Sequence, residues 1–431
     1  MQNAARIQAA IELLDELIAS AQPADRIMSQ YFRQRRYIGS KDKRAIAEHF
    51  YSVMRQRAAL DWLLKEHGLQ IAGTNLMASY LQLAGEFDCA DFSGQRHHPQ
   101  RLPETDLSAL QRIQPAMLDA APLHVRCNVP EWLLPLLEPV LGHDFEIEMQ
   151  AMNQRATTDV RVNSLKSDAQ TVLAALAAQG IAAQAGQLAP HAVVLKQRAA
   201  LSNLAAFKQG LFEIQDQGSQ LLALATGVQP GDRVVDFCAG AGGKTLALAA
   251  MMENRGSITA CDVHSKRLQE LAKRAKRAGA HNIRVHHLSS ERDKWVKQHA
   301  DKADVVLIDA PCSGTGTWRR NPDSRWHIDQ HSLNRLIDLQ KSILLSAARL
   351  VKPGGRLVYA TCSLLAEENE QQVATFLQQF SQFSRSPMGN SDWFGDLGDQ
   401  LQIREHAVRT FPGRSGCDGF YVAALARGDL A

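Results

Sequence analysis

Apolar residues recur every three or four positions in the N-terminal part of the chain, as on one face of a helix. They form two groups: Ile7, Ile11, Leu14 and Ile18, then Ile46, Phe50, Val53, Leu60, Leu63 and Leu64. Ser40 is the expected N-cap of the second helix. Residues 88–105 are polar and aperiodic, which predicts a loop. The pattern therefore predicts an all-helical first domain, residues 1–125.

The periodicity changes near Pro130. A short helix is expected over 130–142, with Pro130 in its first turn and Gly142 near its end. Strand-like runs at 160–165 and 192–196 flank a helix over 168–180. Together these elements predict a small α+β module, residues 126–205.

Strands and helices alternate from about residue 211. Apolar strands are expected at 233–237, 257–262, 283–287, 304–310 and 356–362, with helices at 243–254, 264–278, 329–351 and 366–380. Such strands with helical crossovers indicate a parallel sheet covered on both faces. Residues 419–426 would add an antiparallel edge strand. The prediction is a doubly wound α/β domain, residues 206–431, whose ligand lies beyond the carboxyl ends of the strands.

Composition narrows the class of protein only slightly. The 431 residues are 45% hydrophobic and 22% charged, with a net charge of +3, which is typical of a soluble globular protein. Any basic surface for a nucleic acid must therefore be local. One basic run, interleaved with Phe32 and Tyr37, is either a solvated helix end or a contact to an RNA backbone. Its members are Arg33, Arg35, Arg36, Lys41, Lys43 and Arg44.

The start of the chain and the cysteines indicate the compartment. Glu12, Asp15 and Glu16 interrupt the apolar pattern of the first residues, which excludes a secretory signal, and no later stretch is long and apolar enough for a membrane span. The seven cysteines are spread singly without a C-x-x-C pair, which argues against disulfides or a zinc site. We expect a cytoplasmic protein with reduced thiols, no metal and no membrane association.

The first strand of the α/β domain runs into the glycine-rich segment DFCAGAGGKT (236–245). A P-loop would need glycine at position 238, and a dinucleotide fingerprint would need glycine at position 245. The third interpretation is the first loop of a methyltransferase, where the backbone approaches the methionine part of S-adenosylmethionine. The loop alone leaves all three open. Its candidate binding residues are Cys238, Ala239, Gly240, Ala241, Gly242, Gly243 and Lys244.

The second strand ends in Asp262. A carboxylate at this place suits the two ribose hydroxyls of an adenosine, whereas a P-loop NTPase has no need of it. The alternative is an acidic cap on the helix that starts near His264. We favour ribose binding.

Two cysteines follow neighbouring strands. The fourth strand ends in DAPCSGTG (309–316) and the fifth in ATCSLLAEEN (360–369). A single cysteine there would be read as a small buried hydrophobe. Cys312 and Cys362 facing one crevice, the second close to a helix N-terminus, instead suggest reactive thiols.

Methylation at carbon 5 of cytosine would use two such groups. A thiolate that adds to carbon 6 makes carbon 5 nucleophilic, which splits one difficult step into two easier ones. A second basic group then removes the proton from carbon 5, and the thiolate is expelled. A carboxyl group beside the base can stabilise the adduct.

The segments DFCAGAGGKT, DAPCSGTG and ATCSLLAEEN resemble the motifs of the Sun/nucleolar-protein family of RNA (cytosine-5) methyltransferases. PEWL, RVNSLK, EIQDQGSQ, RTFP and DGFYVAAL are similar to further segments of that family, so the resemblance runs from about 128 to 426. It implies a Rossmann-like methyltransferase domain that binds S-adenosylmethionine. The helical N-terminus is similar to the NusB-like RNA-binding domain of members that act on ribosomal RNA.

The resemblance also implies roles for single residues. Cys362 would be the nucleophile, Cys312 would assist proton removal and release, and Asp309 would lie beside both cofactor and target base. The loop 238–244 would bind the cofactor, with Asp262 on its ribose. The family usually has an aspartate near the adenine after the third strand. This chain reads HLSSE (287–291), so that contact passes to Ser289 or is absent.

Basic residues near these motifs are compatible with a polyanion. Trp318 and Trp326 accompany Arg319, Arg320 and Arg325 after the Cys312 motif, and we expect this loop to contact RNA. For the helix at 264–278, rich in lysine and arginine, we favour a solvated face.

The expected function is methylation of carbon 5 of a cytidine in structured RNA. Ribosomal RNA, and 16S ribosomal RNA in particular, is the first expectation, transfer RNA a possible one, and the enzyme is expected to be a monomer. The alternatives are a non-catalytic RNA-binding assembly factor and a P-loop ATPase, the latter disfavoured by Cys238.

Overall fold

The computed structural model describes residues 1–20, 22–404 and 406–428. They form two compact units, one of residues 1–154 with 318–329, the other of 155–317 with 330 onward. The three predicted ranges stay a prediction, because the two units neither coincide with them nor test whether each range folds by itself. None of the described helices is both long and apolar enough to cross a membrane.

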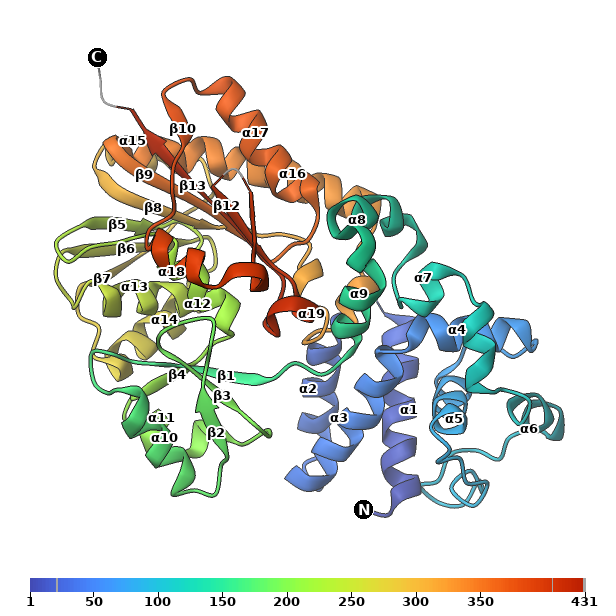
Figure 1. Cartoon of the computed structure of the whole chain (residues 1–431). Helices are drawn as coiled ribbons and strands as arrows, with labels where there is room; N and C mark the ends of the chain where they lie inside the picture. Colours follow the sequence, from blue (N-terminus) through green and yellow to red (C-terminus); the bar gives the residue numbers. More distant parts are fainter. Residues whose placement is uncertain (21, 405, 429–431) are drawn as a thin grey trace. The chain divides into compact units, whose positions relative to one another are not determined.

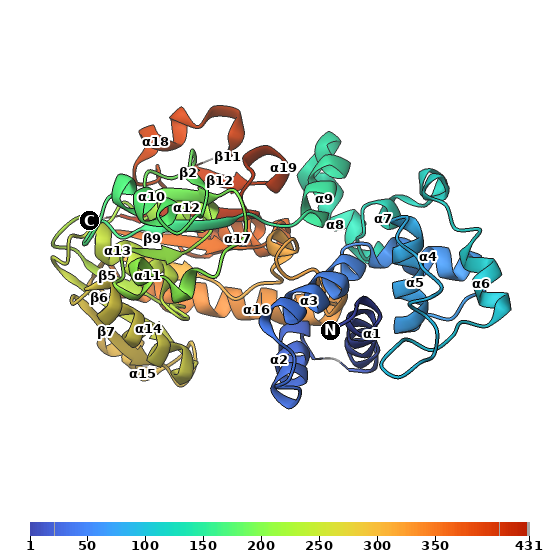
Figure 2. The same cartoon turned by 90° about the horizontal axis from the view of Figure 1, so that it is seen from below.

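The first unit is helical, and α1, α3, α4 and α5 pack around one apolar core (Figures 1 and 2). Helix α3 begins at Ser40 itself, with Gly39 at the N-cap and no side-chain capping bond, so the predicted Ser40 cap is wrong by one position. The helices are α1 (Asn3–Ala19), α2 (Ala24–Gln34), α3 (Ser40–Met54), α4 (Arg57–Glu66), α5 (Gly73–Leu83), α6 (Glu104–Leu110), α7 (Leu123–Arg126), α8 (Leu134–Leu141) and α9 (Phe145–Asn153).

The segment 318–329 leaves the second unit in sequence and completes the core of the first. Trp318 and Arg325 are both fully buried, at 0% exposure. The guanidinium of Arg325 donates to the carbonyl of Asn128 (2.6 Å) and to Asn153 Oδ1 (2.7 Å), and it lies 4.7 Å from the centre of the Trp318 ring. Burial lowers the pKa of Arg325 to about 9.

The expected RNA contact of this loop is therefore wrong for Trp318 and Arg325. A fully buried side chain cannot stack on a displaced base or reach a phosphate. The spacing of arginine and tryptophan that indicated RNA here reflects a cation–π contact inside the first unit.

The second unit begins with a small antiparallel sheet of order β2-β3-β1-β4. Its strands are β1 (Thr158–Val162), β2 (Ala183–Ala185), β3 (Ala192–Leu195) and β4 (Phe212–Ile214), with helices α10 (Ala169–Ala177) and α11 (Ala205–Lys208). Two strands and α10 were predicted. The other two strands have three residues each, too few to show an alternating pattern.

A nine-stranded mixed sheet follows, of order β11-β12-β13-β9-β8-β5-β6-β7, with β10 paired to β13. Strands β5 to β9 are parallel, which confirms the predicted doubly wound α/β fold. The strands are β5 (Arg233–Asp236), β6 (Ser257–Asp262), β7 (Ile283–His287), β8 (Ala303–Asp309), β9 (Val351–Thr361), β10 (Phe383–Arg385), β11 (Gln402–Arg404), β12 (Ala407–Thr410) and β13 (Phe420–Arg427).

Helices cover both faces of this sheet. Val234 and Leu307 belong to the core under α12–α14, whereas their neighbours Val235 and Ile308 belong to the core under α15–α17. The helices are α12 (Gln217–Leu224), α13 (Gly243–Met251), α14 (Ser265–Ala278), α15 (Lys294–Gln298), α16 (Gln330–Ala347), α17 (Glu370–Gln379), α18 (Ser391–Asp396) and α19 (Pro412–Ser415).

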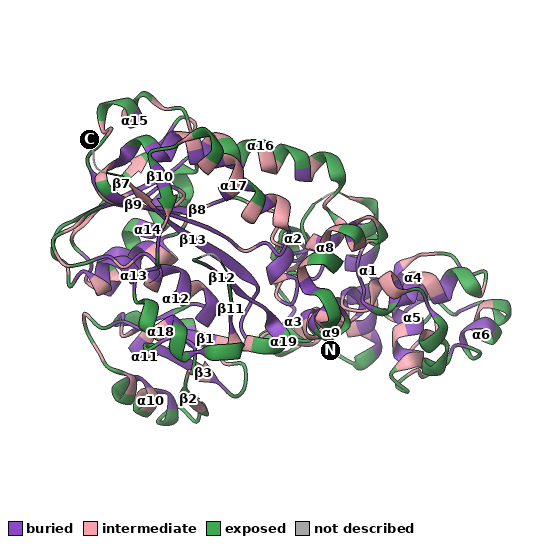
Figure 3. Ribbon diagram, turned by 45° about the horizontal axis from the view of Figure 1, so that its top comes forward, coloured by how far each residue is buried: buried purple, intermediate pink, exposed green. Residues whose placement is uncertain are grey.

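Strand β13 is antiparallel as predicted but lies inside the sheet rather than at its edge. It pairs with β9 on one side and with β12 on the other. Figure 3 shows the middle of the sheet as buried, and residues 420–425 are all buried. The run lacks polar alternation because both faces and both edges are covered.

Candidate functional site

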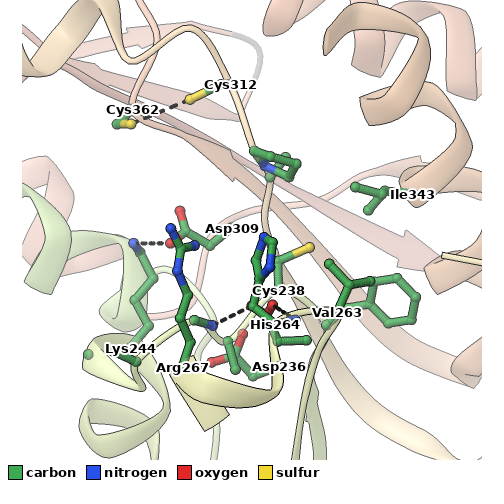
Figure 4. Close-up of a pocket in the computed structure, with 18 of the residues that line it drawn as sticks. Asp236, Cys238, Lys244, Val263, His264, Arg267, Asp309, Cys312, Ile343 and Cys362 are labelled. Carbon is green, nitrogen blue, oxygen red and sulfur yellow. Dashed lines mark hydrogen bonds and ion pairs between the residues drawn. The ribbon is translucent and has the colours of Figure 1, made fainter. Parts of the chain in front are cut away.

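A cavity of about 700 Å³ opens at the carboxyl ends of β5, β6, β8 and β9. This volume suits a cofactor or a drug-sized ligand. Figure 4 shows 18 of the residues that line it, and all the lining residues come from the second unit. The predicted site residues Cys238, Ala239, Gly240, Ala241, Gly243, Lys244, Asp262, Asp309, Cys312 and Cys362 all line it, and Gly242 does not.

Gly242 shapes the glycine-rich loop instead. Its φ is +86°, a left-handed value that disfavours any residue with a Cβ. A Cβ built there would also come within 2.4 Å of Leu271 Cγ on α14. The loop can therefore turn into α13, and pack on α14, only with glycine at this position.

Asp262 organises the loop from the end of β6. Its Oδ2 accepts from the Gly240 N–H (2.8 Å) and its Oδ1 from the His264 N–H (2.7 Å). The side chain is only 7% exposed. Each carboxylate oxygen has a second lone pair, so both remain able to accept from a ribose hydroxyl. The two predicted interpretations, ribose ligand and helix-start cap, are thus compatible in one side chain.

Asp236, at the end of β5, also lines the cavity and was not predicted as a site residue. Thr245 donates to its Oδ2 (2.7 Å), whereas the buried Oδ1 has no partner among the described residues. Burial raises the pKa of Asp236 to about 7. An unpaired buried acceptor beside a ligand cavity suits a cationic group of the ligand. An acidic residue at the strand end was the available sequence signal.

The small antiparallel sheet holds the 238–244 loop through hydrogen bonds of Arg161. Arg161 of β1 is buried, bonds the side chain of Gln215 and donates to the Gly243 carbonyl (2.8 Å). Gln215 and Ser219 line the cavity themselves, and Gln215 donates to Ser219 (3.1 Å). The segment EIQDQGSQ thus contributes to the site. Spacing alone could not show this, because the contacts join distant parts of the chain.

Helix α14 is not a uniformly solvated face. Arg274 and Arg277 form ion pairs with the buried carboxylate of Glu213, at 2.9 and 2.5 Å. Arg267 lines the cavity (Figure 4), so it is a site residue that charge patterning placed on the solvated face. Lys266, Lys273 and Lys276 are exposed, as expected.

Apolar residues from three elements line another part of the cavity. Val263, Leu288 and Ile343 could flank the faces of an adenine ring. Ser289 does not line the cavity, and its hydroxyl donates to Asp293 (2.6 Å) at the start of α15. Of the two expected alternatives, Ser289 or no such contact, the geometry therefore does not support Ser289.

Lys244 and Asp309 form an ion pair of 2.6 Å within the cavity. The Lys244 side chain is 10% exposed and that of Asp309 33%. Burial opposes the charge of Lys244, but the Asp309 carboxylate and the nearby Cys362 sulfur raise its pKa. Lys244 therefore remains a cation and can stabilise a thiolate at Cys362.

The two predicted cysteines meet. Cys312 Sγ and Cys362 Sγ are 3.4 Å apart (Figure 4). The hydrogen bond between them is the larger cause, and burial the next, that raises the pKa of Cys312 well above its usual range. Burial likewise raises the pKa of Cys238, the third cavity thiol. Cys238 is thus protonated near neutrality, which is the wrong state for a resting nucleophile.

These residues fit the cofactor implied by the sequence. Asp262 offers acceptors to a ribose, and Asp236 offers an unpaired carboxylate oxygen to an ammonium group. The backbone of 239–243 allows the cofactor to approach closely. The Cys312 and Cys362 thiols lie at the other end of the same cavity, beyond the Lys244–Asp309 pair (Figure 4). The arrangement can place a methyl donor against a base held by the thiols.

Family models match two parts of the chain. Residues 223–426 match the model for the 16S rRNA methyltransferase RsmB/F, and residues 129–202 match the ferredoxin-like domain of RsmF/B-like methyltransferases.

Curated relatives extend over most of the chain. It is 30% identical over 408 residues to the ribosomal RNA small subunit methyltransferase B of Enterobacter sp. (strain 638), covering 90% of this chain and 92% of the relative. It is 33% identical over 319 residues to the enzyme of the same name from Pasteurella multocida, covering 73% and 69%.

Solved structures share the fold. The crystal structure of the protein PH0851 has a TM-score of 0.78, at 26% identity over 99% of both chains. A methyltransferase homolog protein from Pyrococcus horikoshii has a TM-score of 0.61, at 27% identity over 73% of this chain and all (100%) of that one.

Proposed function

Because the chain belongs to the RsmB/F family of 16S rRNA methyltransferases, we propose that it methylates carbon 5 of a cytidine in small-subunit ribosomal RNA. The proposed chemistry is a covalent adduct between Cys362 and carbon 6 of the base. The observation that carries it is the approach of Cys312 Sγ and Cys362 Sγ to 3.4 Å inside the cofactor cavity.

The chain is a methyltransferase that depends on S-adenosylmethionine. When bound, this cofactor supplies an electrophilic methyl group. Asp262 would hold the ribose, Asp236 the ammonium group and the loop 238–244 the methionine part. Family membership supports the methyltransferase interpretation of that loop over the dinucleotide fingerprint and the P-loop ATPase.

Cys362 starts the reaction in this proposal. Its thiolate, stabilised by the Lys244 cation, forms a bond to carbon 6, and the electron pair of the 5,6 double bond makes carbon 5 nucleophilic. Asp309, which lines the same cavity, would hydrogen-bond the N3/N4 edge of the base in this proposal.

Cys312 acts after carbon 5 has been methylated. Once Cys362 is bonded to carbon 6 it carries no charge, and one cause of the raised Cys312 pKa is gone. In the proposal Cys312 loses its own proton to solvent in the open cavity, and its thiolate accepts the carbon 5 proton. The electrons of that C–H bond restore the 5,6 double bond, and the Cys362 thiolate leaves.

RNA is the proposed partner. The relatives are named for small-subunit ribosomal RNA, and the run 33–44 supplies exposed cations in the helical unit. Bisulfite sequencing of ribosomal and transfer RNA from a deletion strain would identify the nucleotide. A ribosomal cytidine that loses its methyl group is the expected result.

The two thiols are separated by trapping. With RNA and S-adenosylmethionine, Cys312→Ala should still attack and methylate but should release product slowly, leaving an RNA-linked band on a denaturing gel. Cys362→Ala and the double variant should show neither band nor methylation. Cys89→Ala, at an exposed thiol of the helical unit, is the matched control and should behave as wild type.

Three outcomes would contradict the scheme. A trapped band in Cys362→Ala would exchange the two roles. Full activity in both single variants would make the thiols structural. Absence of methylation by the wild-type protein on every RNA tested would favour the non-catalytic assembly factor.

A further inference from the structure

A buried polar cluster holds the turn that carries Cys312. The Glu368 carboxylate accepts from the Ser313 N–H (2.8 Å) and from the Ser313 hydroxyl (2.5 Å). Gln340 Nε2 donates to Glu368 (2.9 Å) and to the Pro311 carbonyl (2.9 Å). Glu368 and Gln340 are both fully buried, at 0% exposure. The residues on both sides of Cys312 are therefore fixed by two other elements.

The cluster is unusual because it buries a carboxylate without a cation. Among the described residues, the side-chain partners of Glu368 are Ser313 and Gln340, both neutral, and no lysine or arginine pairs with it. Tyr359 donates to its carbonyl (2.7 Å), which fixes the backbone as well. Burying a polar group without partners is costly, but the Glu368 carboxyl group has three hydrogen bonds. These hydrogen bonds offset the cost of burial, and they are the same bonds that hold the 311–313 turn.

Cys362 is held by bonds that do not involve the Glu368 side chain, although the Ser313 hydroxyl also lies 3.2 Å from Ser363 Oγ. Its carbonyl accepts from the Gly316 N–H (2.9 Å), and the Leu364 N–H donates to Thr315 Oγ1 (2.8 Å). A Cβ at Gly316 would lie 2.0 Å from the Gly419 carbonyl oxygen, so the backbone that bonds the Cys362 carbonyl is closely packed against Gly419. Loss of the Glu368 contacts should therefore loosen Cys312 more than Cys362.

We propose that Glu368, assisted by Gln340, is a positioning residue for the second half of the reaction. It holds the 311–313 turn so that Cys312 Sγ stays beside the carbon 5 proton of the adduct. This inference rests on the proposed function, because it acts through Cys312. It assigns Glu368 no contact with substrate or cofactor.

Glu368→Ala should reproduce the signature of Cys312→Ala. Methyl transfer in a single turnover should persist, multiple turnover should fall on the order of a hundredfold, as when a reacting group is displaced by about an ångström, and an RNA-linked band should accumulate. Glu368→Gln keeps the shape and one acceptor oxygen for the Ser313 N–H, so it should restore most of the turnover. Ser313→Ala removes the hydroxyl that donates to Glu368, and Gln340→Ala removes the bond to the Pro311 carbonyl. Both variants should therefore also accumulate the band.

Glu370→Ala is the matched control. Glu370 lies two residues from Glu368 and forms an ion pair with Arg409. Among the described residues, its side chain forms no hydrogen bond or ion pair with 311–313. Its loss should lower thermal stability but leave no band. This separates positioning of Cys312 from general destabilisation.

The results also separate this inference from the proposed function. If Cys312→Ala traps an adduct but folded Glu368→Ala and Ser313→Ala turn over as wild type without a band, the positioning role is wrong. A band in Glu368→Ala that survives the additional change Cys362→Ala would overturn it too. If Cys312→Ala itself traps nothing, the proposed function fails, and the inference with it.

Discussion

Asp262→Ala tests the cofactor end of the site. The change removes a carboxylate that accepts from the Gly240 N–H at 2.8 Å and from the His264 N–H at 2.7 Å. It therefore has two consequences, a loosened loop and the loss of the proposed ribose contacts. An experiment on binding must separate them.

The expected loss of binding follows from the hydrogen bonds involved. A hydrogen bond to a charged group contributes about 1.5–3 kcal/mol, so Asp262→Ala should raise the dissociation constant of S-adenosylhomocysteine roughly 10- to 150-fold. Loss of the loop contacts should lower the free energy of unfolding as well, because two N–H groups of a largely buried turn lose their acceptor.

Calorimetry with two ligands distinguishes the two effects. Wild type should bind S-adenosylhomocysteine more tightly than its 2′,3′-dideoxy analogue by that same factor, and Asp262→Ala should bind both equally weakly. Asp293→Ala is the control, since Asp293 also accepts from backbone N–H groups after a strand but does not line the cavity. A variant that still discriminates between the ligands would refute the ribose contact, and an unchanged dissociation constant would refute any role in binding.

Three further predictions concern other parts of the molecule. Because burial raises the pKa of Asp236 to about 7, the folded protein binds an extra proton below that pH. The unfolding free energy of wild type relative to Asp236→Asn should therefore fall as pH rises from about 4 to 7. A difference that does not change with pH in urea titrations would contradict this. Neutralising the exposed Arg33 and Arg36 should reduce the log–log salt slope of RNA binding by roughly 0.7–0.9 for each lost contact, with cofactor affinity as control; an unaltered slope returns the run to a solvated helix end. Trp318→Ala should destabilise the helical unit by about 3–5 kcal/mol, seen as faster hydrogen exchange there, and unchanged exchange would show that 318–329 is dispensable for its core.

The structure refines the second of these predictions. Arg35 belongs to the basic run, yet its guanidinium lies 3.7 Å from the centre of the Tyr31 ring and pairs with Glu12 at 3.3 Å. It is therefore committed within the helical unit, whereas Arg33 and Arg36 are exposed. Charge patterning cannot make this distinction, because it contains no information about partners on another helix.

Local pattern was sufficient for the parallel sheet and for the residues at its strand ends. Buried strands between two helical layers must be continuously apolar, and the carboxyl ends of parallel strands meet at one edge. That rule brought the 238–244 loop, Asp262, Asp309, Cys312 and Cys362 to one cavity, where the structure places all of them except Gly242. A resemblance to known motifs then supplied the chemistry that composition does not show.

Two of the errors have the same physical cause. Trp318 and Arg325 have the composition of an RNA contact, but residues nearly two hundred positions earlier enclose them. Residues 419–426 were expected to form an edge strand, but the strand at 407–410 pairs with their outer edge. In both cases the environment of a segment is made by chain that is distant in sequence.

By itself, the sequence determined which elements form, where the parallel strands end and which reactive side chains stand there, because spacing and strand polarity are properties of neighbouring residues. Only the tertiary structure decided the partners of those side chains. It paired Lys244 with Asp309, left Asp236 Oδ1 without a partner and placed Glu368 under the Cys312 turn. Burial, hydrogen bonding and pKa depend on atoms within a few ångströms, and most of these come from other elements of the fold.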